Sequence, residues 1–213
     1  MKAALNQITA KELKIDILFN NAGGSFADLK YTKQGREMHF ELQTVVPYII
    51  VMELKELLLK GSLKTIVNTS STAFKTMKHF SPEQLERPTT FKKLFGPYAS
   101  SKMALSLWTH EIAPSLLAEG ITILSVDPGG NNTMRKGKKS GLPFYLKPIM
   151  KLFFPHPSKG ASLLYNAAMQ QNKSLSGHFF VNGKVTKLKF LQHGRNILDK
   201  VSSIYYKDFA SKS

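Results

Sequence analysis

The sequence predicts an α/β fold with an open, mainly parallel sheet flanked by helices. Short apolar runs alternate with stretches in which apolar residues recur at intervals of three and four, and the short runs end in polar turn signals. Strands separated by helix-length segments pair in parallel through right-handed crossovers, which gives an open sheet. No internal repeat or second domain is evident, so one domain is expected over residues 1–213.

Two elements are expected in the first part of the chain. Residues 15–19 form a short apolar run that stops at the turn signal Asn20–Gly23, which indicates a buried strand leading into a loop. Residues 36–60 have helical periodicity and Gly61 stands in the C-cap position, which indicates an amphipathic helix. Pro47 is expected to kink this helix.

The middle of the chain is expected to supply two further strands and a second long helix. Residues 63–68 are β-branched and apolar and run into the hydroxyl side chains of residues 69–72. A helix is expected from Tyr98 to Leu117, after a loop that contains prolines. The strand expected over residues 121–126 stops at residues 127–130.

The last part of the chain is expected to add a helix near residues 158–170 and a strand near residues 178–185, followed by polar, peripheral residues after Lys187. Ligands of open parallel sheets bind beyond the carboxyl ends of the strands, so the polar loops there should converge on one edge. In this chain those loops are residues 20–23, 69–71 and 128–133.

Composition and charge limit the class of protein. The chain has 42% hydrophobic residues and no cysteine, which supports a packed core and excludes disulfide scaffolds, thiolate metal sites and thiol nucleophiles. The six histidines show no ligand spacing, so no metal is expected. A net charge of +16 favours nucleic acid, an anionic membrane or a phosphate-bearing ligand as partner. No nucleic-acid-binding module is recognisable, so nucleic acid is not expected.

The location of the protein is expected to be cytoplasmic. Residues 1–14 lack the apolar stretch of a secretory signal. No window approaches the roughly 18–20 apolar residues that a membrane-spanning helix needs.

Tyr98 and Lys102 stand four residues apart at the start of the second long helix, so their side chains share one face. An ammonium group near a phenol stabilises the phenolate, which lowers the tyrosine pKa from roughly 10 and makes the residue a usable general acid. The hydroxyl of Ser71, at a neighbouring strand end, is placed to hold the same carbonyl oxygen. Because the helix dipole disfavours a cation in the first turn, an anionic or electron-rich group should compensate Lys102.

Four segments together resemble the short-chain dehydrogenase/reductase family in their order and spacing. They are Asn20–Asn21–Ala22–Gly23, Ser70–Ser71, Tyr98-x-x-x-Lys102 and Pro128–Gly129-x-x-x-Thr133. The resemblance covers residues 15–185 and implies a Rossmann-like sheet. The long segment between Ser71 and Tyr98 and the strand near residues 177–180 resemble the retinol-dehydrogenase-like subgroup.

The resemblance implies a role for each matching residue. Tyr98 would be the acid/base and Ser71 would position the carbonyl, while Lys102 would tune Tyr98 and bind the nicotinamide ribose of NAD or NADP. The other residues expected to border the cofactor are Asn20, Gly23, Pro128, Gly129 and Thr133. The family also implies a homodimer formed through the two long helices.

Two features depart from the family pattern. No Gly-x-x-x-Gly-x-Gly or Gly-x-Gly-x-x-Gly occurs, and the strand at residues 15–19 resembles the family's fourth strand. The N-terminal strand–helix units that hold the diphosphate are therefore expected to be missing, which leaves this strand as an exposed edge. Gln43 stands where the family helix usually offers the asparagine of a proton relay, and no role is assigned to it.

Plainer interpretations of the same residues stay open. Asn20–Gly23, Ser70–Ser71 and Pro128–Gly129 could be turns that end strands. The basic residues within 135–139 form either a solvated loop or a contact with phosphate or lipid. The apolar stretch 142–155 is core, a lid over a lipophilic substrate, or a segment in a membrane interface, so peripheral membrane contact stays open.

Two functions are therefore carried forward. The first is an NAD(P)-dependent oxidoreductase acting on a carbonyl/alcohol pair of a small apolar substrate, in a shortened form whose activity is left open. The alternative is a non-catalytic relic that uses the same fold to bind membranes or protein partners. Saturable binding of NADPH or NADH distinguishes the two.

Overall fold

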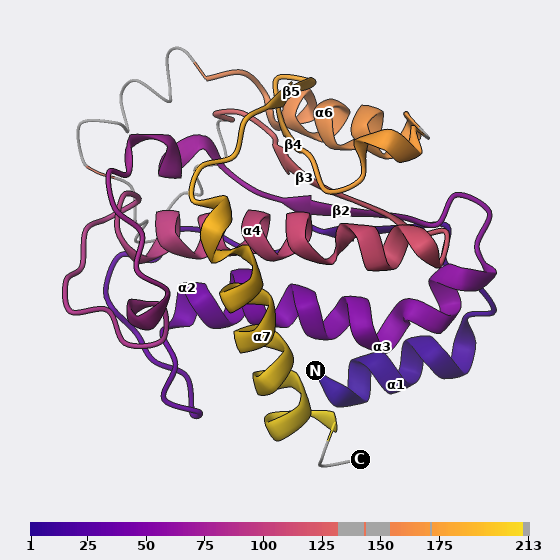
Figure 1. Cartoon of the computed structure of the whole chain (residues 1–213), viewed down its shortest axis with the longest axis horizontal. Coiled ribbons are helices and arrows are strands. Elements are labelled where there is room, and N and C mark those ends of the chain that lie inside the picture. Colours follow the sequence, from indigo (N-terminus) through magenta and orange to yellow (C-terminus); the bar gives the residue numbers. More distant parts are fainter. Residues whose placement is uncertain (132–142, 144–153, 171, 211–213) are drawn as a thin grey trace.

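The computed structural model describes residues 1–131, 143, 154–170 and 172–210 and has a five-stranded sheet at its centre (Figure 1). The strands lie side by side in chain order: β1 (Ile17–Asn20), β2 (Thr65–Thr69), β3 (Thr122–Asp127), β4 (Phe179–Val181) and β5 (Lys184–Thr186). Strands β1 to β4 are parallel, and β5 is antiparallel to β4. The predicted α/β class with an open, mainly parallel sheet is confirmed.

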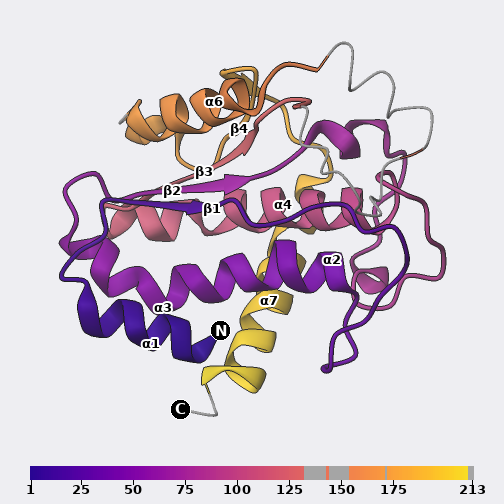
Figure 2. The same cartoon turned by 180° about the vertical axis from the view of Figure 1, so that it is seen from behind.

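Helices cover the two faces of the sheet unequally (Figures 1 and 2). One face carries α3 (Val46–Lys60) and α4 (Pro97–Ala118), with α1 (Lys2–Lys11) packed on α3 and α7 (Gly194–Asp208) packed across α4. The other face carries α6 (Pro157–Met169), which packs on β2 and β3. Short 3-10 turns lie in the connections at Thr72–Thr76, Pro82–Gln84, Lys173–Leu175 and Leu191–His193.

The side-chain alternation of β2 and β3 divides the core into two clusters. Ile66 and Ile123 face the larger cluster, which lies under α3, α4 and α7 and contains the fully buried Trp108. Val67 and Leu124 face the smaller cluster under α6. A parallel sheet is buried on both faces, which explains why these strands are apolar without alternation in the sequence.

The helix predicted over residues 36–60 is present but is not uniform. A short helix, α2 (Met38–Phe40), leads through a π-helical turn (Glu41–Val45) into α3. Pro47 lies in the first turn of α3, where a missing N–H is tolerated. The departure from α geometry lies at the π turn just before the proline.

The strand predicted near residues 178–185 is two strands joined as a hairpin. Asn182 and Gly183 both have positive φ, at 51° and 74°, as the tight type I′ turn requires. The single-strand prediction was therefore wrong at the turn, because the Asn-Gly signal was not used. The hairpin ends the sheet at β5.

The prediction of peripheral residues after Lys187 was also wrong. Residues 194–208 form α7, whose residues Ile197, Val201 and Ile204 are buried against the core. Their spacing of four and three places them on one helix face, while the remaining positions are mostly polar and give the segment its polar composition.

The opposite edge of the sheet is β1. Within the described part of the chain, no strand pairs with its outer edge, and Phe19 is 40% exposed. The sequence-based expectation of an exposed edge strand is met. None of the helices in the described ranges is long and apolar enough to cross a bilayer.

Candidate functional site

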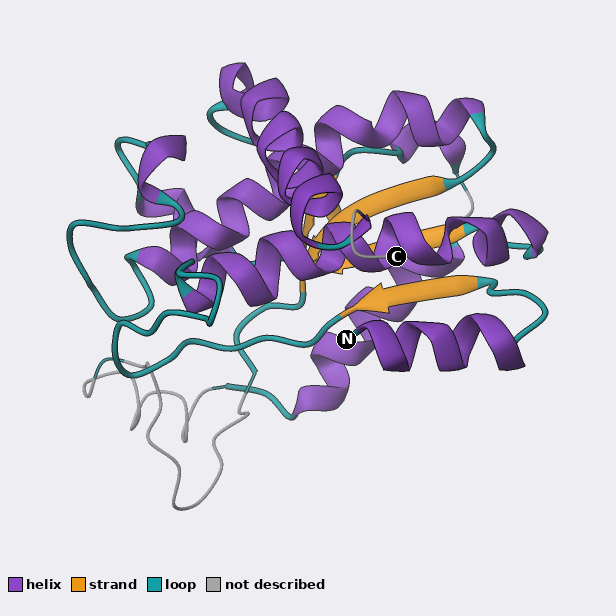
Figure 3. Ribbon diagram, turned by 90° about the horizontal axis from the view of Figure 1, so that it is seen from below, coloured by secondary structure: helices purple, strands orange, loops and turns teal. Residues whose placement is uncertain are grey.

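A pocket lies at the carboxyl ends of β1, β2 and β3, where the sequence predicted that three loops would meet. In Figure 3 the strand arrows point toward the end of the molecule where long loops gather. The pocket has a volume of about 520 Å³, within the range of small-molecule sites. Its lining includes Asn21, Gly23, Ser71, Tyr98, Lys102 and Pro128.

Ser71 and Tyr98 meet at this pocket through their side chains. Ser71 ends the segment after β2 and caps the 3-10 turn that follows, because its Oγ accepts from Ala73 N at 3.2 Å. Tyr98 lies in the first turn of α4, and its side chain hydrogen-bonds Ser71. The two hydroxyls predicted to hold one carbonyl oxygen are therefore neighbours.

The pKa of Tyr98 does not follow the sequence-based expectation. Burial raises the pKa of the phenol above its usual value, the hydrogen bond with Ser71 lowers it, and the charge of Asp127 raises it. The predicted lowering of this pKa by Lys102 is not found: Lys102 is not among the groups that shift it, and the cost of placing a phenolate in a poorly solvated pocket is the largest effect.

Lys102 lies one helical turn after Tyr98 and is almost fully buried, with 4% of its surface exposed. Its Nζ donates to the Thr69 carbonyl oxygen at 2.6 Å, which ties α4 to the end of β2. Burial lowers the pKa of Lys102 to about 7, and the nearby Asp127 acts in the opposite direction. A change in polar surroundings can therefore change its charge near neutral pH.

Asn20 and Ser70 were both singled out in the sequence and make buried hydrogen bonds, and of the two only Ser70 lines the pocket. Asn20 is buried in the sheet, where its Nδ2 donates to Asn68 Oδ1 at 2.8 Å. Ser70 Oγ lies 2.7 Å from Ser106 Oγ on α4. The next residue, Asn21, lines the pocket, so strand alternation could have indicated it in place of Asn20.

The loop after β1 contacts the π turn through Gln43. Gln43 Nε2 donates to the Gly24 carbonyl oxygen at 3.2 Å, while its Oε1 is buried without a hydrogen-bond partner. A Cβ at Gly23 would lie 2.8 Å from that oxygen, so glycine allows the loop and Gln43 to approach each other. Sequence reasoning gave Gln43 no role, and the structure places it on the pocket wall.

Pro128 and Gly129 border the pocket beyond the end of β3, as the sequence predicted. Gly129 has a φ of 76°, which favours glycine, and its N donates to Asp127 Oδ1 at 3.1 Å. Asn131 Nδ2 donates to the carbonyl oxygens of both Pro128 and Gly129 at 2.9 Å and so holds this turn.

Some of the predicted residues cannot be placed. Thr133, the basic residues within 135–139 and the apolar residues 144–153 lie outside the described residues. Phe154, which is described, lines the pocket.

Several groups of the pocket could hold the nicotinamide and ribose end of a dinucleotide. The pocket offers a buried ammonium group at Lys102. Gly24 also lines the pocket and leaves open space there, because no atom lies within 4 Å of a Cβ added at this position. The unpartnered Oε1 of Gln43 is an acceptor suited to an amide or a hydroxyl group. Among the described residues, no three His, Asp or Glu side chains form a candidate metal site.

Comparison with known proteins gives relatives for most of the chain. Polyprenol dehydrogenase of Danio rerio is 28% identical over 205 residues, which cover 92% of this chain and 63% of that protein. Retinol dehydrogenase 11 of Mus musculus is 29% identical over 198 residues, or 92% of this chain and 61% of that protein. The chain thus spans about three fifths of the length of these relatives. No protein-family model matches the chain.

The fold is shared with solved oxidoreductases. An NADPH-bound carbonyl reductase from chicken superposes with a TM-score of 0.57 at 19% identity, over 86% of this chain and 69% of that one. At this identity the likeness shows the fold, which is the Rossmann-like sheet that the sequence predicted.

Proposed function

Because the chain is a homologue of oxidoreductases of the short-chain dehydrogenase/reductase family, we propose that it is an NAD(P)-dependent oxidoreductase of a carbonyl/alcohol pair. The observation that carries this proposal is the convergence of Ser71, Tyr98 and Lys102 on one pocket. A hydroxyl pair and an ammonium group in one small space can bind a carbonyl oxygen and deliver a proton to it.

The roles of the three side chains follow from their contacts. Ser71 and Tyr98 hydrogen-bond each other and would both donate to the substrate oxygen. In the reductive direction Tyr98 gives its proton to that oxygen, and in the oxidative direction it takes the proton back. Lys102 would hold the ribose and would stabilise the phenolate form of Tyr98 after Tyr98 has given up its proton. The nicotinamide, when bound, donates or accepts the hydride.

The remaining predicted residues divide into two groups. Gly23, Pro128 and Gly129 border the pocket, and we propose that they contact the nicotinamide end. Asn20 is hydrogen-bonded to Asn68 inside the sheet, so its proposed role is to hold the end of β1 in place.

The substrate is proposed to be apolar. One part of the pocket wall consists of apolar side chains, namely those of Ala73, Leu94, Phe95, Pro128 and Phe154. Such a wall favours a hydrocarbon group next to the reacting carbon. The names of the relatives, polyprenol dehydrogenase and retinol dehydrogenase, agree with a lipophilic alcohol or aldehyde.

The test is the Tyr98→Phe variant, assayed with retinal and with a medium-chain aldehyde by following NADPH or NADH absorbance. Removing the proton donor should lower kcat/KM by about 100-fold or more without unfolding the protein. Tyr165→Phe is the matched control, because Tyr165 lies exposed on α6. Full activity in Tyr98→Phe would show that this tyrosine is not the acid.

The alternative function is a non-catalytic protein built on the same fold. It is favoured by one observation, the net charge of +16, which suits binding to an anionic surface. Calorimetric titration with NADPH and NADH separates the two functions. Saturable binding supports the oxidoreductase, and no binding of either nucleotide supports the non-catalytic protein.

Two proposals concern partners and location. A homodimer through α3 and α4 would have to share the surface of α4 with α7, which packs across it. Peripheral contact with an anionic membrane is proposed from the net charge of +16 and the apolar pocket wall. Gel filtration and flotation with phosphatidylserine vesicles test these two proposals.

A further inference from the structure

A third ionisable side chain, Asp127, belongs to the pocket. It ends β3, is 5% exposed and lines the same space as Tyr98 and Lys102. The four segments that carry the family resemblance do not include it, and in the sequence it reads only as the end of a strand. A buried carboxyl group next to a proton donor needs a physical explanation.

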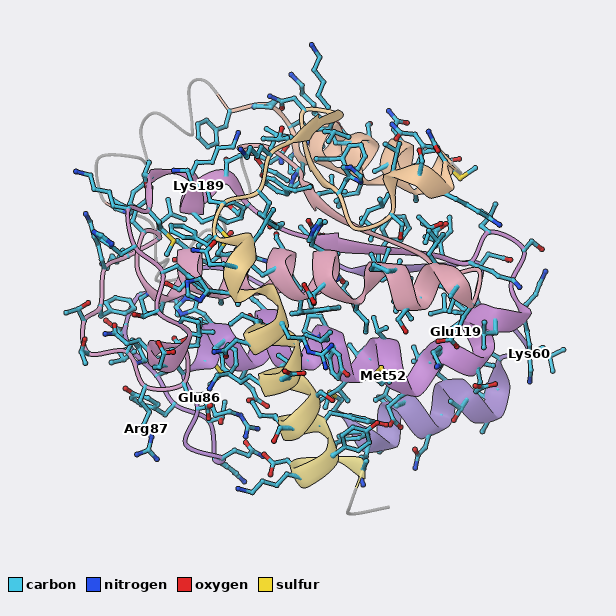
Figure 4. The ribbon with its side chains drawn as sticks, viewed as in Figure 1. Met52, Lys60, Glu86, Arg87, Glu119 and Lys189 are labelled. Atoms are coloured by element: carbon cyan, nitrogen blue, oxygen red, sulfur yellow. The ribbon has the colours of Figure 1, made fainter. Side chains whose placement is uncertain are left out.

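The carboxyl group of Asp127 is held in place by its neighbours. Its Oδ1 accepts from Gly129 N at 3.1 Å, and Thr72 hydrogen-bonds it through both its side chain and its backbone. Thr72 belongs to the 3-10 turn Thr72–Thr76, which is fixed in turn by Lys189 Nζ donating to the Lys75 carbonyl oxygen at 2.7 Å (Lys189 is labelled in Figure 4). The position of Asp127 is therefore determined by two loops.

Among the described residues, the ionisable groups that face Asp127 come from two elements. Tyr98 and Lys102 face it from α4, and Lys75 faces it from the 3-10 turn. The end of β2 and residues 128–131 after β3 present hydroxyl, amide and backbone groups to the pocket. Lys75 is exposed, whereas Lys102 is buried, so Lys102 depends far more on a nearby anion.

Lys102 is the group that needs compensation. Its ammonium is buried in the second turn of α4, where desolvation disfavours a cation. The hydrogen bond to the Thr69 carbonyl oxygen supplies a dipole but no opposite charge. The sequence analysis expected an anionic or electron-rich group near Lys102, and Asp127 is a carboxyl group that lines the same pocket.

We propose that Asp127 is a positioning residue whose carboxylate keeps Lys102 and Tyr98 protonated, so that the pocket keeps its proton-donating form up to higher pH. This inference rests on the proposed function of the Tyr98 site. Asp127 acts through the two α4 side chains and makes no contact with substrate.

The electrostatic directions agree with this role. Burial lowers the pKa of Lys102 to about 7, and Asp127 raises it again. Burial raises the pKa of Tyr98, the Ser71 hydrogen bond lowers it, and Asp127 adds to the rise. The carboxyl pKa of Asp127 is itself raised by burial, while Gly129, Thr72 and Lys75 lower it. Once ionised, the carboxylate favours the protonated form of both partners.

The first test is the pH dependence of reductive kcat/KM in Asp127→Asn. Without the carboxylate, Lys102 and Tyr98 lose their protons at lower pH, so the alkaline midpoint should move about one pH unit toward acid. Asp127→Glu should restore the wild-type midpoint, because it keeps the charge. Glu119→Gln removes a negative charge at the far end of α4, labelled in Figure 4, and should leave the midpoint unchanged.

A role in packing alone would lower activity at all pH values without moving the midpoint, and that result would overturn the inference. Asp127→Gln compared with Asp127→Glu repeats the experiment at a second side-chain length. This pair keeps the test decisive where Asp127→Asn does not fold.

The second test needs no activity. In a double-mutant cycle, Asp127→Asn, Lys102→Met and the double variant are unfolded in urea at pH 6 and pH 9. The folded-state pKa of Lys102, about 7, lies below its unfolded value of 10.5, so folding stability falls as the pH drops from about 10.5 to about 7 and stays at its lower value below 7, where the ammonium is present in the pocket. Asp127 should reduce that loss.

The cycle should therefore show a favourable coupling of about tenfold in the folding equilibrium at pH 6 that is nearly absent at pH 9. Equal coupling at both pH values would reject the charge pair, whatever the enzyme assays give. Coupling at pH 6 in a chain that turns over no substrate would reject the proposed function and keep the charge pair.

Discussion

At the scale of single residues, the buried pair Glu37 and His39 fixes the loop that borders the pocket. His39 Nδ1 lies 2.6 Å from Glu37 Oε1, and His39 Nε2 accepts from Phe26 N at 2.9 Å. The ring proton is therefore on Nδ1, and both ring nitrogens are used. Glu37 Oε2 also accepts from Phe40 N at 3.0 Å, so one carboxylate caps α2 and orients the imidazole.

We expect His39→Phe to lower the free energy of unfolding by about 3 kcal/mol, because it leaves a buried carboxylate and a backbone N–H without a partner. Urea denaturation measures the change. His79→Phe, at an exposed position, should change stability by less than about 0.5 kcal/mol. Equal effects of the two substitutions would show that the His39 hydrogen bonds contribute nothing.

Much of the site could be predicted at this scale, because its residues stand at strand ends and at a helix start. Ser71, Tyr98 and Lys102 were singled out from their places at a strand end and a helix start and from the family resemblance, and all three line the pocket. Asp127 and Gln43 were not assigned roles, since their functions depend on which long-range neighbours bury them. Burial of that kind leaves no mark in the local sequence.

At the scale of elements, the junction between α3 and β1 depends on Gly61. A Cβ at Gly61 would clash with the carbonyl oxygen of Ile15, so no side chain fits while α3 and the segment before β1 keep their positions. Ile15 N also donates to the Leu57 carbonyl oxygen at 2.9 Å, which closes the same junction. The glycine read from the sequence as a helix cap therefore also permits a close backbone approach.

Gly61→Ala should lower the free energy of unfolding by about 3 kcal/mol, since backbone atoms on both sides must shift. Gly24→Ala is the control, because no atom lies within 4 Å of its added Cβ. Thermal and urea unfolding of the two variants give the comparison. A Gly61→Ala protein as stable as wild type would mean that α3 and β1 can move apart without cost.

The elements that sequence reasoning missed differ in the signal they leave. The Asn182–Gly183 turn and the Ile197, Val201, Ile204 spacing are both visible in the sequence, so the hairpin and α7 could have been predicted. The π turn at Glu41–Val45 has no comparable local signal. It packs against α4 and α7, which lie far from it in the sequence.

At the scale of the whole molecule, the sheet formed by the described residues ends at two edge strands, β1 and β5. Strand β5 is the second strand of a short hairpin, whereas β1 is a parallel edge strand that carries the partly exposed Phe19. Open edges with apolar side chains promote association between chains. The net charge of +16 opposes this association at low salt.

Phe19→Lys should reduce concentration-dependent association, most clearly in high salt where the net charge is screened. Light scattering and sedimentation at increasing protein concentration measure it. Leu13→Lys adds the same charge at a position that is 87% exposed and precedes the strand. If both substitutions reduce association equally, the added charge is responsible and the edge of β1 is not.

The ion pairs of Arg36 connect the last helix to the pocket. Arg36 Nη1 contacts Asp208 Oδ2 at 2.5 Å, and Arg36 Nε contacts Glu41 Oε2, at the start of the π turn, at 2.5 Å. Asp208 and Arg36 are 172 positions apart in the chain. A purification tag or fusion partner attached directly after α7 would therefore disturb the Arg36–Asp208 ion pair and, through it, the turn that carries Gln43. A flexible spacer between α7 and the tag avoids this effect in assays of the pocket.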